Sequence, residues 1–288
     1  MKIRKAVIVA AGLGTRMLPA SKVVPKEILP VVDRPAIQVI VEEAVASGIS
    51  EIVLVLSPGR FIAREHFEPA LDLERQLESR GKNDLLTMIR KTNAPARITT
   101  AIQNEPLGLG HAVLQARAAI GDEPFGVFYP DDIVDSEVPL LRQIINATDR
   151  VDGPVVSLMR VQRSDLSKYG IVEATGVGDR LYHLTNMIEK PAPEKAPSDF
   201  AIIGRHVLTP DIFEEIAKLK PGAGGELQLT DALLGLARRR KLYGYEFEGT
   251  RYDLGDRLGF IQAQVGFGLK RPELANDLRA YLRTLAIK

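Results

Sequence analysis

The sequence predicts an α/β protein with a central sheet flanked by helices. An apolar run at 6–11 passes directly into a glycine loop at 12–16, apolar residues recur at helical spacing over 37–45, and 51–56 is a second apolar run. Strand, loop, helix and strand in this order are typical of a parallel sheet, whose strands are buried on both faces and need helical crossovers. Ligands of such sheets bind beyond the carboxyl ends of the strands, so the glycine loop lies where a ligand is expected.

The rest of the chain continues the same pattern. Residues 68–93 are periodic and polar, which predicts a helical pair interrupted at Gly81. Strands are expected at 97–102 and 125–129, with a helix at about 110–120 between them. Later segments predict strands at 155–161, 170–174 and 181–189, helices opened at 209–211 and 230–231, and a last helix at about 272–285. The sequence contains no repeat or linker, so we expect residues 1–288 to form one domain.

Composition excludes several classes of function. Lys and Arg number 38 against 37 Asp and Glu, a net charge of +1, so the chain has no overall field to attract nucleic acid or an anionic membrane. The basic run at 238–241 is interpreted as the solvated end of a helix. The absence of cysteine excludes disulfides, thiolate metal sites and cysteine nucleophiles. We therefore expect neither nucleic acid nor a membrane as a partner.

The N-terminus superficially resembles a secretory leader, since Lys2, Arg4 and Lys5 precede the apolar run. The run is short and has no small-residue cleavage site after it, so a buried strand explains it better. No apolar run approaches the roughly 20 residues needed to cross a bilayer. The sequence therefore favours a cytoplasmic protein.

The glycine loop, residues 12–16, combines backbone that can approach phosphate oxygens with a cation, Arg16. Met17 stands where the dinucleotide fingerprint requires a third glycine, which argues against a nicotinamide-dependent dehydrogenase, and no Gly-Lys-Ser/Thr follows as in a P-loop. Lys22 and Lys26 continue the basic character over a proline-rich segment unsuited to helix or central strand. Such cations suit a polyphosphate, and a solvated basic loop is the alternative.

A pair of carboxylates, Asp131 and Asp132, follows the strand expected at 125–129. It therefore lies at the same sheet edge as the glycine loop. A carboxylate in that position has the hardness of a magnesium ligand, with phosphate oxygens and water completing the octahedron. The alternative is a turn aspartate that bonds its own backbone.

Several motifs together resemble a known family. The stretch AAGLGTRMLPASKVVPKEILPVVDRP closely resembles the opening signature of bacterial UTP-glucose-1-phosphate uridylyltransferases, which belong to the sugar-1-phosphate nucleotidyltransferase family. Later blocks are similar to the family's in the same order, namely GLGHAV (108–113), YPDDIV (129–134), YGIV (169–172), IEKP (188–191), IIGRHVLTP (202–210), GAGGELQLTDAL (222–233) and YDLGDRLGF (252–260). The chain departs in Ser21, where threonine is usual, and in an insertion at 68–93 that is shorter than in many members, which bears on oligomer contacts.

The resemblance implies a Rossmann-like nucleotidyltransferase fold with a central mixed, mostly parallel sheet flanked by helices. It implies a nucleotide-binding half at about 1–135, a sugar-phosphate-binding half at about 136–260, and a homo-dimer or homo-tetramer. The implied reaction is a magnesium-assisted in-line attack of glucose 1-phosphate on the α-phosphorus of UTP, giving UDP-glucose and pyrophosphate. The alternatives are dTTP or another hexose 1-phosphate as substrate, or a nucleotide-sugar sensor without catalysis.

Site residues follow from the residue chemistry and the resemblance together. Arg16 and Lys26 are candidates for the triphosphate, since a guanidinium and an ammonium complement accumulating phosphate charge. The resemblance selects Asp131 over Asp132 as a metal ligand and suggests Asp253 as the second. It assigns the nucleotide to Ala11, Gly12, Gly14, Gln103, Gly108 and Asp131, and the sugar phosphate to Gly170, Glu189, Lys190, Gly204 and Glu226, with Lys190 also catalytic.

Simpler alternatives stand beside these roles. Lys26 could pair with neighbouring Glu27, and Glu189 with Lys190 could be a plain surface ion pair. Strand side chains alternate, so Glu189 and Lys190 face opposite ways unless the backbone turns before Pro191. The Gln103 amide offers a donor and an acceptor to a uracil edge but could be an exposed strand residue. His111, near a helix start, is interpreted as a structural histidine.

Overall fold

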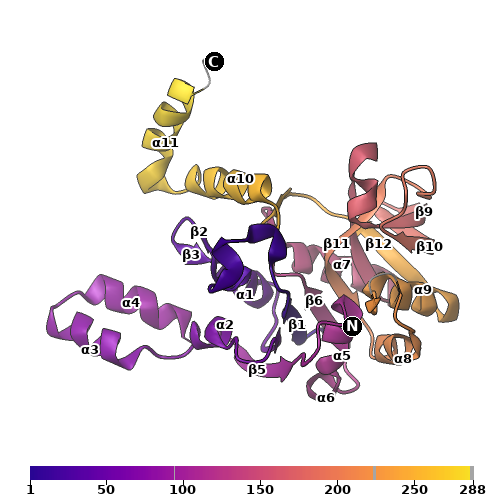
Figure 1. The fold of residues 1–288 in the computed structure, drawn as a ribbon, viewed down its shortest axis with the longest axis horizontal. Coiled ribbons are helices and arrows are strands. Elements are labelled where there is room, and N and C mark those ends of the chain that lie inside the picture. Colours follow the sequence, from indigo (N-terminus) through magenta and orange to yellow (C-terminus); the bar gives the residue numbers. More distant parts are fainter. Residues whose placement is uncertain (94, 223–224, 286–288) are drawn as a thin grey trace.

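A nine-stranded mixed sheet forms the centre of the protein, with strand order β5-β4-β1-β6-β11-β8-β12-β10-β9 (Figure 1). The structure is a computed structural model that describes residues 1–93, 95–222 and 225–285. The strands are β1 (Lys5–Ala10), β2 (Pro30–Val31), β3 (Arg34–Pro35), β4 (Glu51–Leu56), β5 (Arg97–Ile102), β6 (Phe125–Phe128), β7 (Asp132–Asp135), β8 (Val155–Arg160), β9 (Gly170–Gly178), β10 (Leu181–Glu189), β11 (Phe200–Leu208), β12 (Leu242–Glu246) and β13 (Thr250–Asp253). The helices are α1 (Ala36–Ala46), α2 (Ile62–Glu65), α3 (Leu71–Ser79), α4 (Asn83–Thr92), α5 (Leu109–Gln115), α6 (Arg117–Ile120), α7 (Leu140–Val151), α8 (Asp211–Lys218), α9 (Leu229–Arg239), α10 (Arg257–Gly268) and α11 (Pro272–Leu285).

The sheet is parallel in the first half of the chain and mainly antiparallel in the second. β1 pairs in parallel with β4 and β6, and β4 with β5, because helical segments connect these strands. β11 runs antiparallel to both β6 and β8, and β9 and β10 form a hairpin across Asp179 and Arg180. The mixed sheet confirms the expected architecture, but the predicted predominance of parallel pairing holds only for the first half.

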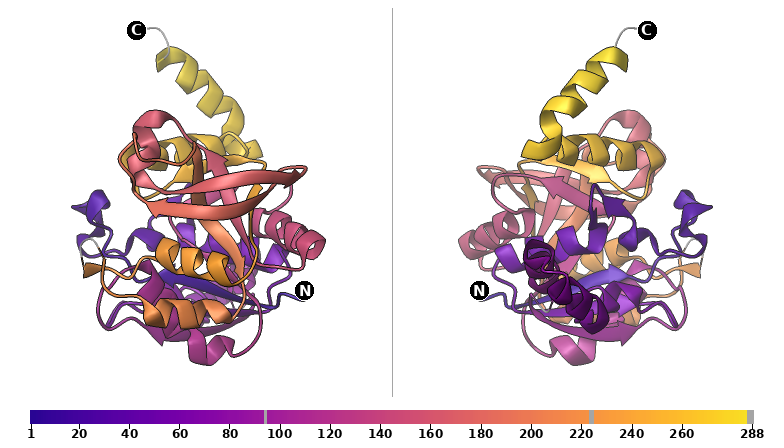
Figure 2. Two further views of the ribbon diagram at one scale, coloured as in Figure 1. Left: turned by 90° about the vertical axis from the view of Figure 1, so that its right-hand side faces the viewer. Right: turned by 90° about the vertical axis from the view of Figure 1, so that its left-hand side faces the viewer.

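Alternation along the strands divides the apolar residues between two cores. Ala6 and Ile8 of β1 point to the face covered by α1 and α7, whereas Val7 of the same strand points to the face covered by α5, α8 and α9. The side views show helices on both faces of a twisted sheet (Figure 2). The two cores explain why β1, β4 and β6 read as continuous apolar runs.

Helices outside the sheet follow the predictions closely. The segment expected to be a helical pair forms α3 and α4, which project from the body, and α11 spans the range expected for the last helix (Figure 1). The helix expected at about 110–120 is interrupted at Ala116 between α5 and α6. Within the described ranges, no helix is long and apolar enough to cross a membrane.

Two features of the topology position the site. β11 enters the sheet between β6 and β8, so the first and second halves of the chain share one sheet. The two-stranded pair β7–β13 then brings Asp253 into register with Asp132, although the two residues lie far apart in sequence. The carboxylates at the end of β6 thereby meet a segment from the end of β13.

Candidate active site

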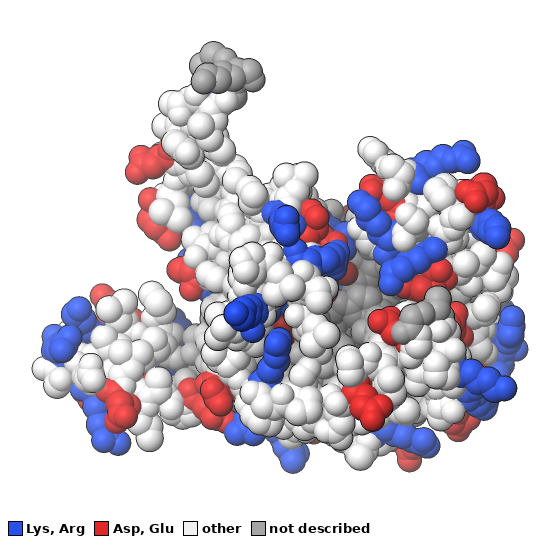
Figure 3. Space-filling view, in the orientation of Figure 1, with Lys and Arg blue, Asp and Glu red and all other residues white. Residues whose placement is uncertain are grey.

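A cavity of about 810 Å³ opens at the carboxyl ends of β1 and β6, the edge expected for a ligand. Its size lies within the range of small-molecule sites. In the space-filling view, a hollow lies between the two halves of the molecule with Lys and Arg atoms along its rims (Figure 3). Of the fourteen predicted site residues, thirteen line the cavity, namely Ala11, Gly12, Gly14, Arg16, Lys26, Gln103, Gly108, Asp131, Gly170, Glu189, Lys190, Glu226 and Asp253.

The glycine loop begins where β1 ends. Gly14 has a φ of 67°, a conformation that favours glycine, and its carbonyl accepts a hydrogen bond of 2.6 Å from Ser21 Oγ. Serine and threonine both carry a hydroxyl, so the departure at position 21 keeps the group that makes this hydrogen bond. The proline-rich segment forms three short 3₁₀ turns, at Thr15–Met17, Ala20–Lys22 and Lys26–Ile28. These turns carry Arg16 and Lys26 to the cavity.

Lys26 forms its ion pair with Asp131, not with its neighbour Glu27. The distance from Lys26 Nζ to Asp131 Oδ2 is 2.5 Å, and both side chains are largely buried. Burial opposes the charged form of each group, but their mutual attraction outweighs it, so the pKa of Lys26 is raised and that of Asp131 is lowered. A cation and a carboxylate are therefore both kept charged at the cavity wall.

Asp131 and Asp253 approach each other around Arg16. The Arg16 guanidinium lies 3.6 Å from Asp131 Oδ2 and 3.7 Å from Asp253 Oδ2, and Leu254 N donates to Asp131 O at 2.7 Å. Asp253 Oδ1 accepts from Gly255 N at 2.9 Å, so one oxygen makes the turn contact of the simpler interpretation while the other faces the cavity. Two carboxylates fit the needs of Mg²⁺, which takes one or two from a protein and completes its shell with phosphate and water.

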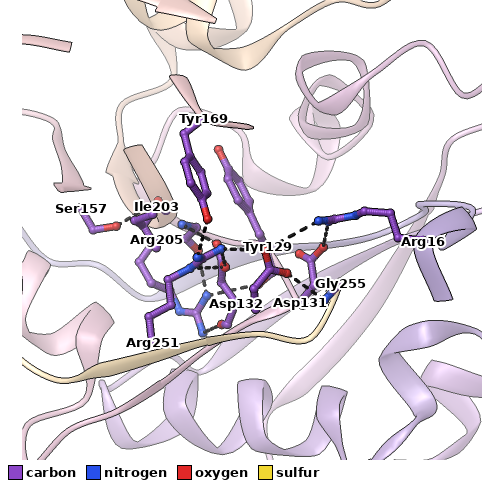
Figure 4. A network of polar contacts seen from close by, with 12 residues as sticks. Arg16, Tyr129, Asp131, Asp132, Ser157, Tyr169, Ile203, Arg205, Arg251 and Gly255 are labelled. Atoms are coloured by element: carbon purple, nitrogen blue, oxygen red, sulfur yellow. Dashed lines mark hydrogen bonds and ion pairs between the residues drawn. The ribbon is translucent and has the colours of Figure 1, made fainter. Parts of the chain in front are cut away.

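Asp132, the neighbour of Asp131, is buried, and its carboxylate binds protein groups. Its carboxylate accepts from Gly204 N at 3.0 Å and from Arg251 Nε at 2.6 Å (Figure 4). Arg251 also donates to Tyr169 Oη at 2.9 Å and pairs with Asp253 at 3.3 Å. Asp132 thus holds the backbone of the site, and Asp131 keeps its side chain at the cavity.

A buried arginine lies beneath the two aspartates. Arg205 of β11 is fully buried and pairs with Glu43 of α1 through Nε at 2.9 Å and Nη2 at 2.6 Å. It also donates to the carbonyl oxygens of Asp132 at 2.8 Å and of Tyr129 at 3.3 Å (Figure 4). These two carbonyls flank Asp131, so Arg205 fixes the loop that presents it.

Glu189 and Lys190 lie at the other wall. β10 ends at Glu189, and Lys190 has a φ of 47°, so the backbone turns there and both side chains reach the cavity. Lys190 Nζ is 3.3 Å from Glu189 Oε1, the ion pair of the simpler interpretation, and Thr230 Oγ1 donates to Glu189 Oε2 at 2.7 Å. A side chain at Gly170 would collide with Thr230, which explains the glycine.

Gln103 and Gly108 form the wall near the glycine loop. Gln103 follows β5 and is buried, which contradicts the alternative of an exposed strand residue. Gly108 has a φ of 94°, and a Cβ on it would lie 2.8 Å from Glu226 Cβ. Glu226 therefore contacts the Gly108 side of the cavity and accepts from Gln228 Nε2 at 2.7 Å.

Gly204 is the predicted site residue that does not line the cavity. A Cβ at this position would lie 2.6 Å from Tyr129 Cβ and 2.7 Å from Asp132 Oδ2. The glycine is required by the packing of β11 against the loop that carries Asp131. The sugar-phosphate role that the resemblance assigns to Gly204 stays a prediction.

Other residues of the cavity escaped the sequence analysis. Thr230, Tyr169 and Arg251 line it. Thr230 bonds to Glu189 and Arg251 to Asp253. Thr230 and Tyr169 entered the sequence analysis only within a motif or a helix start, and Arg251 did not enter it. The block YDLGDRLGF begins one residue after Arg251, and a basic residue before a carboxylate was the available signal.

Comparisons with known proteins identify the family of the chain. Residues 5–267 match the family described as Nucleotidyl transferase. A UTP–glucose-1-phosphate uridylyltransferase of Streptococcus pneumoniae serotype 4 is 46% identical over 286 residues, which cover 98% of this chain and 95% of that protein. The solved structure of a UTP-bound UGPase from Acinetobacter baumannii has a TM-score of 0.90 and 34% identity, with 100% of both chains covered. A UDP-glucose pyrophosphorylase complexed with UDP-glucose has a TM-score of 0.86 and 37% identity, with 94% of this chain and 100% of that chain covered. The chain belongs to the nucleotidyl transferase family.

A pH dependence of stability follows from Glu27. Burial raises the pKa of Glu27 from 4.5 to about 7, and its Oε2 has no hydrogen-bond partner among the described residues. Because the folded state binds the Glu27 proton more tightly than the unfolded state, protonated Glu27 favours the fold, and this stabilisation is complete below pH 4.5. It is lost as the pH rises to about 7. Glu27→Gln is expected to be more stable than the wild type by up to about 3 kcal/mol at pH 8, with little difference near pH 4.5.

Denaturant unfolding of both proteins between pH 4.5 and 8.5 measures this difference. Glu65→Gln is the matched control, since Glu65 is exposed on α2. An equal effect of the two substitutions at every pH would contradict the prediction.

Proposed function

We propose that this protein transfers a uridylyl group from UTP to glucose 1-phosphate, giving UDP-glucose and pyrophosphate. The relatives named above carry that activity in their names, and the similar solved structures contain UTP or UDP-glucose. The observation that carries the proposal is the meeting of Arg16, Lys26, Asp131 and Lys190 at one cavity from four segments of the chain. This combination suits two anionic substrates.

The reaction requires the protein mainly to position the two substrates and to stabilise negative charge. The attacking oxygen of a sugar 1-phosphate is already an anion, so no general base is required. Catalysis then consists of holding two anions together and stabilising charge that spreads over the transferring group and the leaving pyrophosphate. The proposed residues match this requirement, since they are mainly cations and metal-type carboxylates.

In the nucleotide-binding half, about 1–135, we assign the triphosphate to Arg16 and Lys26, with the backbone of Gly14 beside them. A guanidinium can bind two phosphate oxygens at once, and an ammonium acts as a point charge on the same chain of phosphates. Ala11, Gly12, Gln103 and Gly108 are assigned to the base. Burial of Gln103 beside Gly108 supports this assignment, because a buried amide reads a base edge without competition from water.

Asp131 and Asp253 are proposed to hold Mg²⁺, which when bound would neutralise phosphate charge and polarise the transferring group. Their common approach to Arg16 supports the pairing. The aspartates themselves supply hard oxygen ligands at the wall of the cavity. Arg251 orients Asp253 from the interior side.

In the sugar-phosphate-binding half, about 136–260, Lys190 is proposed to bind the phosphate and Glu189 the sugar hydroxyls. Thr230 fixes the Glu189 carboxylate, and Gly170 leaves room beside it. Glu226 is a further candidate for this half, and it lies beside Gly108, which is assigned to the base. Gly204 also stays a candidate for this half, and it supports the site through the packing of the Asp131 loop.

Two further expectations remain proposals. Self-association is supported by exposed apolar residues on the projecting α11, where Leu274, Tyr281 and Leu285 are 40%, 59% and 57% exposed. A homo-dimer or homo-tetramer would cover them. A cytoplasmic location stays a prediction of the sequence.

The proposed function is tested by pyrophosphate release with magnesium present. UTP, dTTP, ATP, CTP and GTP are each supplied with glucose 1-phosphate or galactose 1-phosphate. We expect release to be fastest with UTP and glucose 1-phosphate. Preference for dTTP or another sugar would keep the chemistry and change the substrate, and no release with any pair would favour a nucleotide-sugar sensor.

Asp131→Asn is expected to lower turnover by orders of magnitude while the fold persists, since a metal-type ligand is removed and no core residue. The same assay measures turnover, and thermal unfolding checks the fold. Asp122→Asn, an exposed aspartate on the loop before β6, is the matched control. Near-normal magnesium-dependent turnover in Asp131→Asn would refute the assignment.

Lys190→Ala is expected to raise the KM for glucose 1-phosphate at least tenfold more than the KM for UTP, because one phosphate loses its cation. Steady-state kinetics with each substrate varied in turn measure the two effects. Lys195→Ala, which removes an exposed lysine five residues away, should leave both constants unchanged. Equal losses for both substrates would count against the proposed role.

A further inference from the structure

The Gln103 amide nitrogen lies within hydrogen-bond distance of two groups of the protein that can accept its hydrogens. Gln103 Nε2 donates to Gly108 O at 3.0 Å and contacts His111 Nδ1 at 3.2 Å. An amide nitrogen carries two hydrogens, so neither remains for a ligand when His111 Nδ1 is the acceptor of the second. No donor from the described part of the chain hydrogen-bonds to Gln103 Oε1, and this oxygen is not among the buried unpaired atoms. The carbonyl oxygen is therefore the group that Gln103 offers to the cavity it lines.

The orientation of this amide is fixed by its two acceptors. A half-turn of the amide would bring Oε1 against Gly108 O, and two acceptor oxygens repel each other. Gln103 is only 6% exposed, so water has little room to relieve that contact. The Gly108 oxygen accepts only one of the two amide hydrogens. The other hydrogen needs a second acceptor, and His111 Nδ1 is within reach.

The His111 ring can accept from only one of its two glutamine neighbours. His111 Nε2 lies 3.1 Å from Gln115 Nε2, and a neutral imidazole has one N–H and one acceptor nitrogen. Gln115 Nε2 also donates to His111 O at 3.2 Å, but Gln115 is half-buried, so water can take over its bonds when its amide turns or leaves the ring. Gln103 is buried and has no such relief. The arrangement that satisfies all three side chains has an acceptor at Nδ1 and a proton on Nε2.

We infer that His111, together with the Gly108 carbonyl, holds the Gln103 amide with its oxygen toward the base and so contributes to the rejection of cytosine. The inference rests on the proposed function and specifies its nucleotide class. An acceptor oxygen matches the ring N–H of uracil or thymine, whereas the corresponding ring nitrogen of cytosine is itself an acceptor. His111 touches no reacting atom and acts through Gln103, so it is a positioning residue.

A second consequence concerns the two bases that carry this N–H. Uracil and thymine present the same donor and acceptor edge, so Gln103 cannot distinguish UTP from dTTP. Any preference between them must come from the C5 methyl group or the ribose 2′-hydroxyl. The contribution of His111 is therefore confined to rejection of cytosine.

The test compares variants that keep or remove the acceptor at position 111. His111→Leu and His111→Ala lack one, and His111→Asn retains one because its Oδ1 can lie near the position of the ring Nδ1. Values of kcat and KM are measured for UTP and CTP with glucose 1-phosphate. We expect the Leu and Ala variants to lose at least tenfold of the preference for UTP over CTP, mainly through a higher KM for UTP. The Asn variant should retain most of it.

Gln115→Ala is the matched control, since it removes the other neighbour of the ring and leaves the Gln103 contact. Its preference for UTP over CTP should stay within twofold of the wild type. If the Leu or Ala variant keeps the wild-type preference and changes only in thermal stability, His111 is purely structural and the inference fails. If one of these two variants does not fold, the other is compared with Asn, and equal preferences would overturn the inference.

Failure of the proposed function is a separate result. It is read from the wild-type protein, which would then release no pyrophosphate from UTP. Wild-type turnover of UTP with unaltered preference in the His111 variants overturns only the inference. Loss of preference in Asn as well as in Leu would also overturn it, because the acceptor would then not be the cause.

Discussion

The buried pair between Arg205 and Glu43 is the interaction on which the site depends. A guanidinium with no exposed surface must have its charge and donors satisfied, and Arg205 finds partners on α1, on its own strand and on the loop after β6. Removing one partner of such a pair costs about 3–5 kcal/mol, since an uncompensated charge is left inside. The same bonds that satisfy Arg205 fix the carbonyls on either side of Asp131. Stability and site geometry are thus supplied by one residue.

That arrangement also links the two halves of the chain. Arg205 belongs to β11, which comes from the second half and enters the sheet beside β6 of the first. Asp132 accepts from Gly204 on the same strand and from Arg251 on the way to Asp253. The loop after β6 is therefore held by groups from β11 and β13 together. Two halves built on separate sheets would lack this common support.

The sequence predicted the first half of the fold well because its signals are local. Continuous apolar runs identified β1 and β4, glycines marked the loops, and the helical pair appeared as periodic leucines. Asp131 was identified as a chemistry-bearing residue from charge next to a strand end, and Lys26 from the basic character of the proline-rich segment after the glycine loop. Their mutual ion pair was not, because nothing local joins residues that meet only through parallel strand order.

Other features lie beyond single-sequence reasoning for physical reasons. Arg205 interrupts an apolar strand and reads as an exposed residue, since its burial depends on Glu43 from another element. Asp253 was proposed only through resemblance, and its approach to Asp131 depends on the β7–β13 register. The sequence indicated correctly that a glycine is needed at position 204. The atoms that leave no room for a side chain there belong to Tyr129 and Asp132, which are distant in sequence. A glycine shows that space is limited without showing what fills it.

The charges in the cavity explain how one site can suit two anions and remain stable without them. Lys26 is paired with Asp131, Lys190 with Glu189, and Arg251 with Asp132. Since buried unpaired charges are costly, a cavity with excess cations would weaken the fold before any ligand arrived. In the proposed reaction, a phosphate that attracts Lys26 or Lys190 exchanges one anionic partner for another. The carboxylate oxygens left by that exchange are hard, charged ligands at the point where a divalent cation is proposed to bind. When a phosphate replaces a carboxylate as the partner of a lysine, the desolvation cost of that lysine changes little. The affinity for the phosphate then depends on geometry more than on net charge.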